Sequence, residues 1–397
     1  MVKKQSIILR IDEETHNTIK IKANLFGKKK SDYIRHSSLS FWDKSTDNIK
    51  FFKKLLKDYQ EGSEEDKKLI VNLLFEYYRR NGYPHNELTD EQKIEEMDKV
   101  INSNKILLEE DHLQQNLIGI GLANYFHPHM VEARYKGRDK SPYETYSNDD
   151  NLKDCINRWM ELGKTPNPAG IRRILKTRDG SRGVVNFKSV ISKFIYQNYT
   201  PENGKVLDPC SGYSGRLVGC IAANKNLLYH GIDPDKRTMV GNTKCASFFN
   251  NRYDPIFSNK IYNYRFRFDL GCAEDIMPEI REEYDLVFTS PPYHNTEIYS
   301  EEKDQSCNKY QEYQEWLDKF LFVICRESKR ILKSGGYLII NLKNYKKNPI
   351  ADDFVNYCKD LGFLLEKTYQ MRMGNSEYHR IEGKKMYHTE PIFVFKK

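Results

Sequence analysis

The sequence predicts an α/β protein whose C-terminal half is a doubly wound, parallel sheet preceded by a helical region. Two observations predict this fold class. From residue 204 onward, short apolar segments typical of strands alternate with segments typical of helices. No turn signal of the hairpin type separates these strands until the last two. Strands that alternate with helices in this way form a parallel sheet that is covered on both faces.

The strands and helices are expected in regular succession. Strands are predicted at 205–209, 227–234, 266–273, 284–292, 336–343, 364–372 and 391–396, the last two forming a pair. Helices are predicted between them at 217–225, 236–250, 313–332 and 351–362. Upstream, helices are predicted at 51–59, 66–80, 90–101, 112–126 and 187–199. Changes in composition divide the chain into three expected parts, at 1–42, 43–165 and 166–397.

The charge distribution and the cysteine spacing indicate some classes of protein and argue against others. The chain has 397 residues and a net charge of +8, with local excesses of basic residues at 1–42 and 164–193. Such excesses suit a polyanionic partner. The eight cysteines are spread singly without a Cys-x-x-Cys pair, which argues against a zinc ribbon or a disulfide framework. No apolar run approaches the roughly 18–20 residues that span a membrane. We therefore expect a cytoplasmic protein with no bound metal and no membrane segment.

A turn rich in small residues follows the first predicted strand. In KVLDPCSGYSGRLVGC, Gly212 and Gly215 allow the backbone to pass close to a ligand because they have no Cβ. The next strand ends in GIDPD, where Asp233 can accept hydrogen bonds from both ribose hydroxyls of a nucleoside cofactor. Asp235 is the poorer choice for this role. The plain alternative is that Asp233 caps the following helix.

The third strand ends in GCAEDI, whose loop is expected at the edge of an adenine ring. Glu274 or Asp275 could accept a hydrogen bond from the adenine amine, and the spacing does not choose between them.

The segment YDLVFTSPPYHNTEIY is the most specific signal in the chain. Two prolines cannot extend a central strand, so the strand must stop there, and Pro291 and Pro292 impose a rigid, non-helical geometry. Ser290 Oγ and the Pro291 carbonyl could accept the two N–H bonds of an exocyclic base amine. Tyr293 offers a flat face on which an extruded base can stack. A Pro-Pro turn that merely ends a buried strand is the structural alternative.

The DPCSG and TSPPY segments, about 80 residues apart, resemble the DNA amino-methyltransferases. The resemblance covers roughly residues 165–397 and implies a Rossmann-like class I methyltransferase sheet, S-adenosylmethionine as cofactor and double-stranded DNA as substrate. It implies that Asp208, Pro209 and Gly212 bind the cofactor and that Ser290, Pro291, Pro292 and Tyr293 hold the target amine. A serine at the first catalytic position looks more like the cytosine-N4 enzymes than the adenine-N6 enzymes.

The family also has a phenylalanine ahead of the glycine turn, near the methionine end of the cofactor. Phe187 matches that position, and Lys188 could face the cofactor carboxylate. Two departures stand out. The glycine turn reads SGYSGR, with Arg216 beginning the helix, where many members read GSGT. Cys272 replaces the acid that often follows the third strand's glycine.

The N-terminal segment resembles a ribbon-helix-helix DNA-binding module. In that fold, two chains pair their strands into a ribbon that enters the major groove, so the resemblance implies a homodimer. Period-2 alternation turns Ser6, Ile8 and Arg10 outward toward base edges. The run of Lys28, Lys29 and Lys30 suits phosphates. A strand-helix-helix that serves only dimerisation is the alternative.

Three functions therefore compete. The first is a DNA methyltransferase, which the N-terminal segment and the basic stretch at 164–193 favour. The second is an RNA or protein amine methyltransferase, since a Pro-Pro-Tyr segment also serves those substrates. The third is a DNA-binding regulator with an inactive methyltransferase fold.

Overall fold

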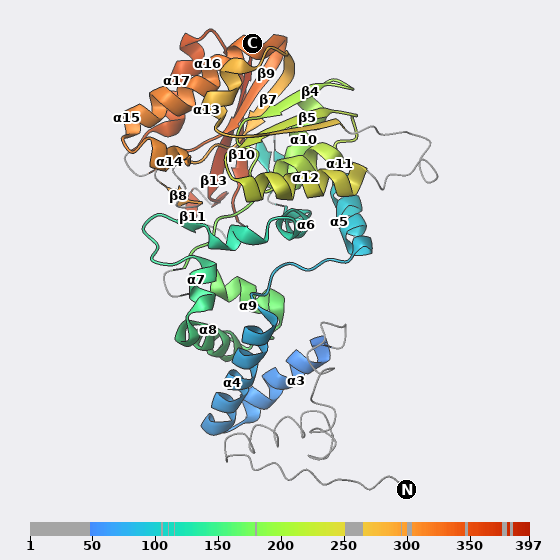
Figure 1. Ribbon diagram of the computed structural model, residues 1–397, viewed down its shortest axis with the longest axis vertical. Coiled ribbons are helices and arrows are strands. Elements are labelled where there is room, and N and C mark those ends of the chain that lie inside the picture. Colours follow the sequence, from blue (N-terminus) through green and yellow to red (C-terminus); the bar gives the residue numbers. More distant parts are fainter. Residues whose placement is uncertain are drawn as a thin grey trace. The chain divides into compact units, whose positions relative to one another are not determined.

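The computed structural model describes residues 48–397 except 105, 110, 115, 179–180, 251–264, 295, 300–303, 346–347, 375–378 and 382–383. The predicted N-terminal module, with Ser6, Ile8, Arg10 and Lys28–Lys30, lies outside the described residues. The chain divides into two compact units (Figure 1). Among the described residues, the helical unit comprises 48–85 and 139–182, and the sheet unit comprises 86–138 and 183–397.

The helical unit contains five described helices: α3 (Asn48–Glu61), α4 (Glu64–Asn81), α7 (Pro142–Ser147), α8 (Asp149–Glu161) and α9 (Pro168–Leu175). Helix α4 begins at Ser63, whose hydroxyl accepts from the Asp66 backbone N–H in a capping box. The buried Tyr78 hydroxyl donates to the Pro166 carbonyl at 2.7 Å, which ties α4 to the start of α9. Buried aromatic and aliphatic side chains of α3, α4 and α8 thus give this unit a core of its own.

The sheet unit is built on a nine-stranded sheet in the order β1-β2-β10-β13-β9-β7-β4-β5-β6, as far as the described residues show. The central strands are β4 (Lys205–Asp208), β5 (Leu228–Asp233), β6 (Arg265–Leu270), β7 (Tyr284–Thr289) and β9 (Leu332–Asn341). These five are parallel to one another. Chain order reverses between β4 and β7, because the chain runs outward through β5 and β6 before it returns. The predicted doubly wound sheet is therefore confirmed, with its switch point between β4 and β7.

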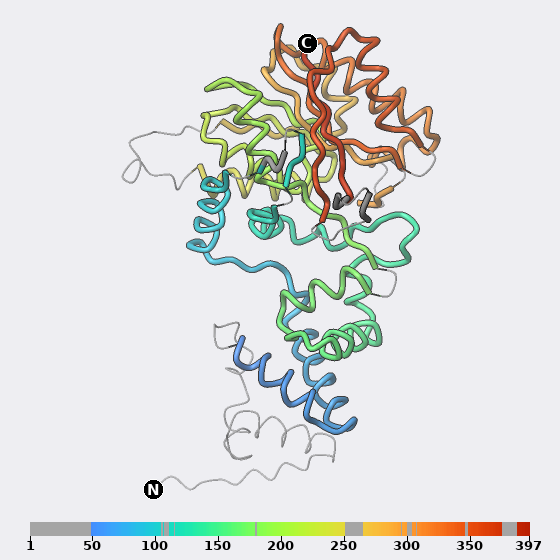
Figure 2. Tube along the Cα trace, turned by 180° about the vertical axis from the view of Figure 1, so that it is seen from behind, coloured from blue at the N-terminus to red at the C-terminus, as the bar shows by residue number. Residues whose placement is uncertain are grey.

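The C-terminal strands β10 (Leu364–Arg372) and β13 (Thr389–Lys396) pair antiparallel, as the sequence predicts. Figure 2 shows them running side by side in red. Between them lies a small hairpin of β11 (His379–Ile381) and β12 (Lys384–Met386). A further pair joins β3 (Arg134–Tyr135) to β8 (Glu297–Ile298).

Alternate residues of each central strand enter two cores. Val206, Phe288 and Ile339 pack on one face with helices α5 (Asp90–Asn102), α10 (Ser189–Tyr199), α11 (Gly215–Ala222) and α12 (Lys236–Asn250). Leu207 and Val287 pack on the other face with α16 (Phe322–Ile331) and α17 (Ile350–Asp360). Shorter elements complete the unit: α6 (Ile120–Tyr125), η1 (Pro128–Glu132), α13 (Ala273–Ile276), η2 (Met277–Glu279), α14 (Ser306–Lys309), α15 (Tyr313–Trp316) and the π-helical turn η3 (Leu317–Leu321).

The helix predicted at 112–126 is wrong over its first half. Residues Leu107–Glu109 and His112–Leu113 form strands β1 and β2, and β2 extends the sheet beside β10. The helix cannot begin earlier than α6 because Gly119 adopts a left-handed φ of +82° at its start. Two short strands interrupted by a bulge leave little periodicity for a sequence reading to detect.

Several basic residues of the stretch at 164–193 make contacts within the protein. The Arg172 guanidinium donates to the carbonyls of Pro84 and His85. The Lys193 ammonium is buried and donates to carbonyls at the end of α5. Arg178 pairs with Asp154, and Lys188 is buried. This stretch therefore gives less support to a nucleic-acid surface than its composition suggests. Among the described residues, no helix has the length and apolarity that crossing a bilayer requires.

Candidate active site

Asp208 ends β4 at the switch point and is completely buried. Its carboxylate accepts from Arg216 Nε at 2.7 Å and Nη2 at 3.1 Å, from the Tyr229 hydroxyl at 2.7 Å and from Thr289 Oγ1 at 2.8 Å. Through these four hydrogen bonds, Asp208 links β4 to β5, β7 and the start of α11. All lone pairs of the carboxylate are used, so none is available to accept from a ligand. The unexpected Arg216 of the glycine turn is the counter-ion of this aspartate.

The glycine turn depends on close backbone approach. Gly212 has a left-handed φ of +56°. A Cβ at Gly215 would lie 2.3 Å from the Phe187 carbonyl oxygen and 2.4 Å from Asn186 Oδ1, so helix α11 could not start where it does with any other residue. The turn and the Phe187 segment are therefore in direct contact, as the sequence interpretation requires of one cofactor pocket.

His127 supports this turn from a part of the chain that the sequence left without a role. Ser214 has a φ of +62°, which is unusual for a residue with a side chain. Its hydroxyl lies 2.7 Å from His127 Nε2 and donates to Asn242 Oδ1 at 2.6 Å. Burial lowers the pKa of His127 to about 3, so the imidazole is neutral at physiological pH. The His-Pro-His run at 127–129 was the available sequence signal.

Asp233 ends β5 beside the glycine turn. Its two carboxylate oxygens accept from the backbone N–H of Gly212 and of Asp235, each at 3.0 Å. Burial raises the pKa of Asp233 to about 7, against the opposing effect of these two hydrogen bonds. Each oxygen retains a further lone pair for a ligand hydroxyl. The position therefore fits the predicted ribose contact, and the local N–H contacts also account for the turn that follows the strand.

Phe187 and Lys188 lie on the other side of the glycine turn. The Phe187 ring packs edge to face on Phe288, with centroids 5.5 Å apart. The Lys188 side chain is buried, and burial lowers its pKa, partly offset by the charge of Glu390. Its ammonium makes no hydrogen bond or close ion pair with the residues that the structure describes. A buried ammonium of this kind calls for an anion.

The predicted catalytic segment, residues 289–293, begins at the last residue of β7. Thr289 is buried, donates to Asp208 and accepts from the Cys210 backbone N–H at 3.2 Å, which couples this segment to the glycine turn. Ser290 is half-buried, and its hydroxyl donates to Asn341 Oδ1 at 3.3 Å. The half-buried Pro292 and the buried Pro291 continue away from the strand end.

Tyr293 lies next to an ion pair formed by Glu390 of β13 and Lys343, which follows the end of β9. Its hydroxyl is 3.5 Å from Glu390 Oε2, and Glu390 also pairs with Lys343. Burial and the charge of Glu390 raise the pKa of Tyr293 well above its usual range, so the phenol stays protonated. The hydroxyl contact of Tyr293 thus comes from a residue that is 97 positions away. Neither Glu390 nor Asn341 was among the site residues predicted from the sequence. In the sequence, each of them is a polar residue near one end of a predicted strand that is otherwise apolar.

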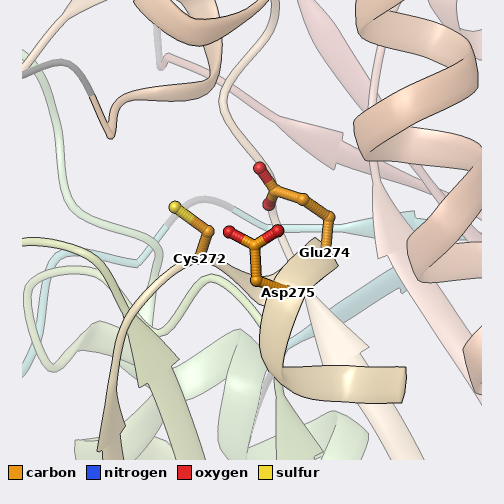
Figure 3. A group of neighbouring side chains, drawn as sticks. All are labelled: Cys272, Glu274 and Asp275. Carbon is orange, nitrogen blue, oxygen red and sulfur yellow. The ribbon is translucent and has the colours of Figure 1, made fainter. Parts of the chain in front are cut away.

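Glu274 and Asp275, the two candidates for the adenine contact, lie at the start of α13. Figure 3 shows them with Cys272, and the three ligand atoms lie within 4.8 Å of one another. Such a donor set could hold a metal ion. The Lys309 ammonium, however, is 3.0 Å from Glu274 Oε1 and 2.7 Å from Asp275 Oδ2 and supplies the positive charge. Glu274 is buried and Asp275 is exposed, but both are paired, so the choice between them stays open.

The predicted site residues therefore gather at one edge of the sheet, from Phe187 through the glycine turn and Asp233 to the catalytic segment. Residues 284–397 match the family model for a DNA methylase of the N6/N4 type. Over this part the chain is similar to the N6/N4 DNA methylases. The match includes the catalytic segment, Asn341 and Glu390, and the cofactor of these methyltransferases is S-adenosylmethionine.

Other comparisons add similarities without a close relative. A search of curated proteins gave no match. Among solved structures, TrmN from Thermus thermophilus is 16% identical with a TM-score of 0.32, over 53% of this chain and 48% of its own, so the alignment spans about half of TrmN. A putative rRNA methylase from Clostridium thermocellum is 12% identical with a TM-score of 0.35, over 54% of this chain and 100% of its own. A methyltransferase from Pyrococcus furiosus is 12% identical with a TM-score of 0.36, over 57% and 93%.

Proposed function

We propose that this methyltransferase acts on double-stranded DNA and methylates an exocyclic base amine, with N4 of cytosine preferred. The observation that carries the proposal is the Thr289–Asp208 hydrogen bond of 2.8 Å. It connects Ser290 and Pro291, which follow Thr289, to the glycine turn, which follows Asp208. A donor of methyl groups and an acceptor amine must meet within van der Waals distance, and this bond fixes the two half-sites relative to each other.

The cofactor is assigned to the residues around the glycine turn. Asp233 accepts from the ribose hydroxyls, and the backbone of Asp208, Pro209, Gly212 and Gly215 shapes the turn beneath the nucleoside. Phe187 lies at the methionine end with Lys188 facing the carboxylate, and Glu274 or Asp275 borders the adenine. S-adenosylmethionine supplies an electrophilic methyl group on a sulfonium when it is bound.

Ser290 and Pro291 make the amine nucleophilic by orienting it. The lone pair of an exocyclic amine is delocalised into the base ring. Acceptance of its two N–H bonds by Ser290 Oγ and the Pro291 carbonyl concentrates the lone pair on the side facing the cofactor. Stacking on Tyr293 contributes roughly 1–3 kcal/mol per base to holding the extruded nucleotide. The displacement then needs alignment more than a strong base.

Mass spectrometry of nucleosides from cells that express the protein tests this function. We expect N4-methylcytosine in the DNA, because a serine at position 290 resembles the cytosine-N4 enzymes. N6-methyladenine would correct the base, and a methylated base confined to RNA would overturn the DNA substrate.

A chain without residues 1–42 provides the second arm of the experiment. The proposed ribbon of Ser6, Ile8 and Arg10 and the phosphate contacts of Lys28, Lys29 and Lys30 would be lost together with dimerisation. We therefore expect a lower DNA methylation level and a monomer in sedimentation. Unchanged methylation by a chain that stays dimeric would contradict the role of the N-terminal segment.

The titration of Asp233 predicts how cofactor affinity depends on pH. Ribose hydroxyls donate better to the ionised carboxylate, so binding is expected to release a proton where Asp233 is protonated. Affinity for S-adenosylmethionine should be constant above the pKa of about 7 and fall by up to about tenfold per pH unit below it. Calorimetric titrations across this range measure the effect, and Asp233→Asn should bind weakly without this slope. The same slope in Asp233→Asn would assign the proton to another group.

A further inference from the structure

The Ser290 hydroxyl can serve the proposed reaction only in one orientation. A hydroxyl has one proton to donate and two lone pairs to accept with. An amine that presents N–H bonds needs the lone pairs, so the serine proton must point at a different acceptor. A hydroxyl free to rotate would spend part of its time with its proton directed at the substrate, where it would repel the amine hydrogens.

Asn341 supplies that acceptor. It is the last residue of β9 and is 2% exposed. Since Thr289 pairs with Ile340 across β7 and β9, Asn341 lies alongside Ser290 in the next register position. Its Oδ1 accepts the Ser290 proton at 3.3 Å, and its Nδ2 donates to the Pro391 carbonyl at 2.9 Å.

The contact with Pro391 fixes which end of the amide faces the serine. The Pro391 carbonyl oxygen can only accept a hydrogen bond, and Pro391 has no backbone N–H that could donate to Asn341 Oδ1 instead. Turning the Asn341 amide over would put two acceptor oxygens together and bring an NH₂ group, a donor, against Ser290. That arrangement would leave the Pro391 carbonyl without its donor. The amide is therefore held with Oδ1 toward Ser290.

We propose that Asn341 is a positioning residue that takes up the Ser290 proton and so presents the serine lone pairs to the target amine. Asn341 does not touch the base or the cofactor in this assignment. The inference rests on the proposed function, because it gives Ser290 the role of acceptor.

A double-mutant cycle tests the inference. Asn341→Ala should lower the single-turnover rate of methyl transfer about tenfold, which is the effect of about 1.4 kcal/mol, with KM for DNA and the Kd for S-adenosylmethionine within about twofold of the wild type. In Ser290→Asp, the ionised carboxylate offers acceptor oxygens and has no hydroxyl proton that Asn341 would need to accept. In that background, Asn341→Ala should change the rate by less than about twofold.

The outcomes are separable. An equal tenfold loss in both backgrounds would overturn the inference and make Asn341 a merely structural residue. If Ser290→Asp is inactive, the same comparison in the residual activity of Ser290→Ala serves, because no hydroxyl proton remains there either. Thermal unfolding of each variant checks that it folds. A wild-type chain that binds S-adenosylmethionine but methylates no DNA would instead refute the proposed function.

Discussion

Replacing Ser290 by alanine is expected to lower the rate of methyl transfer to DNA by at least about a hundredfold and to leave the affinity for S-adenosylmethionine unchanged. The loss of one hydrogen-bonding group that acts on the reacting centre typically costs about 10²–10³ in rate. Ser290 contacts Asn341 and contributes nothing to the glycine turn, which is fixed by Thr289 and Asp208. Tyr293→Ala should have a similar effect because the extruded base loses its stacking surface.

Transfer of a tritiated methyl group to duplex DNA and calorimetric binding of the cofactor measure the two properties separately. Ser147→Ala and Tyr143→Ala are matched controls, since both residues are exposed in the helical unit. Wild-type transfer by both Ser290→Ala and Tyr293→Ala would refute the assignment of the catalytic segment.

Replacing Arg216 by leucine is expected to destabilise the sheet unit by about 3–5 kcal/mol, because it leaves the Asp208 charge buried without its counter-ion. Arg216 is 5% exposed and Asp208 is fully buried, and the charge of Asp208 raises the pKa of Arg216 against the effect of burial. The Tyr229 and Thr289 hydroxyls would still donate to the carboxylate but carry no charge. Cofactor binding should be lost together with stability, since the same carboxylate fixes the glycine turn.

Calorimetric unfolding of Arg216→Leu measures this effect. Arg237→Leu is the control, because Arg237 forms an ion pair with Glu132 at 2.7 Å in which both side chains are more than 40% exposed. Surface pairs contribute about 0–1 kcal/mol. A destabilisation of Arg216→Leu no larger than that of the control would refute the buried ion pair as a main support of the sheet unit.

The sheet could be predicted from the sequence because its strands are short apolar runs that end at recognisable residues. Asp208, Asp233 and Thr289 each close such a run, and the carboxyl ends of parallel strands meet at one edge. Chain order alone therefore brought the glycine turn and the catalytic segment together. Arg216 appeared as a departure from the family pattern, since nothing local shows that its partner is Asp208 in the preceding strand.

The supporting residues could not be predicted because their partners are remote in the chain. Asn341 forms hydrogen bonds with Pro391 and Ser290. His127 contacts Ser214, which is 87 positions away in the chain. The contacts of the basic stretch at 164–193 could not be predicted for the same reason. Composition counts charges but does not reveal that Arg172 and Lys193 donate to buried carbonyls.

Each of the two units is built from two separate segments of the chain, which limits where the chain can be cut to give a fragment that folds. The sheet unit is assembled from Asn86–Arg138 and Gly183–Lys397, with Asp139–Arg182 inserted between them. A fragment that began at residue 166 would keep Ser290 and Asp208 but would lose His127 and the strand β2, and it would uncover the core residues that α5 shields. The sheet unit is therefore not a transferable module. An exchange of contiguous blocks between relatives would have to respect three junctions, after residues 85, 138 and 182, rather than one.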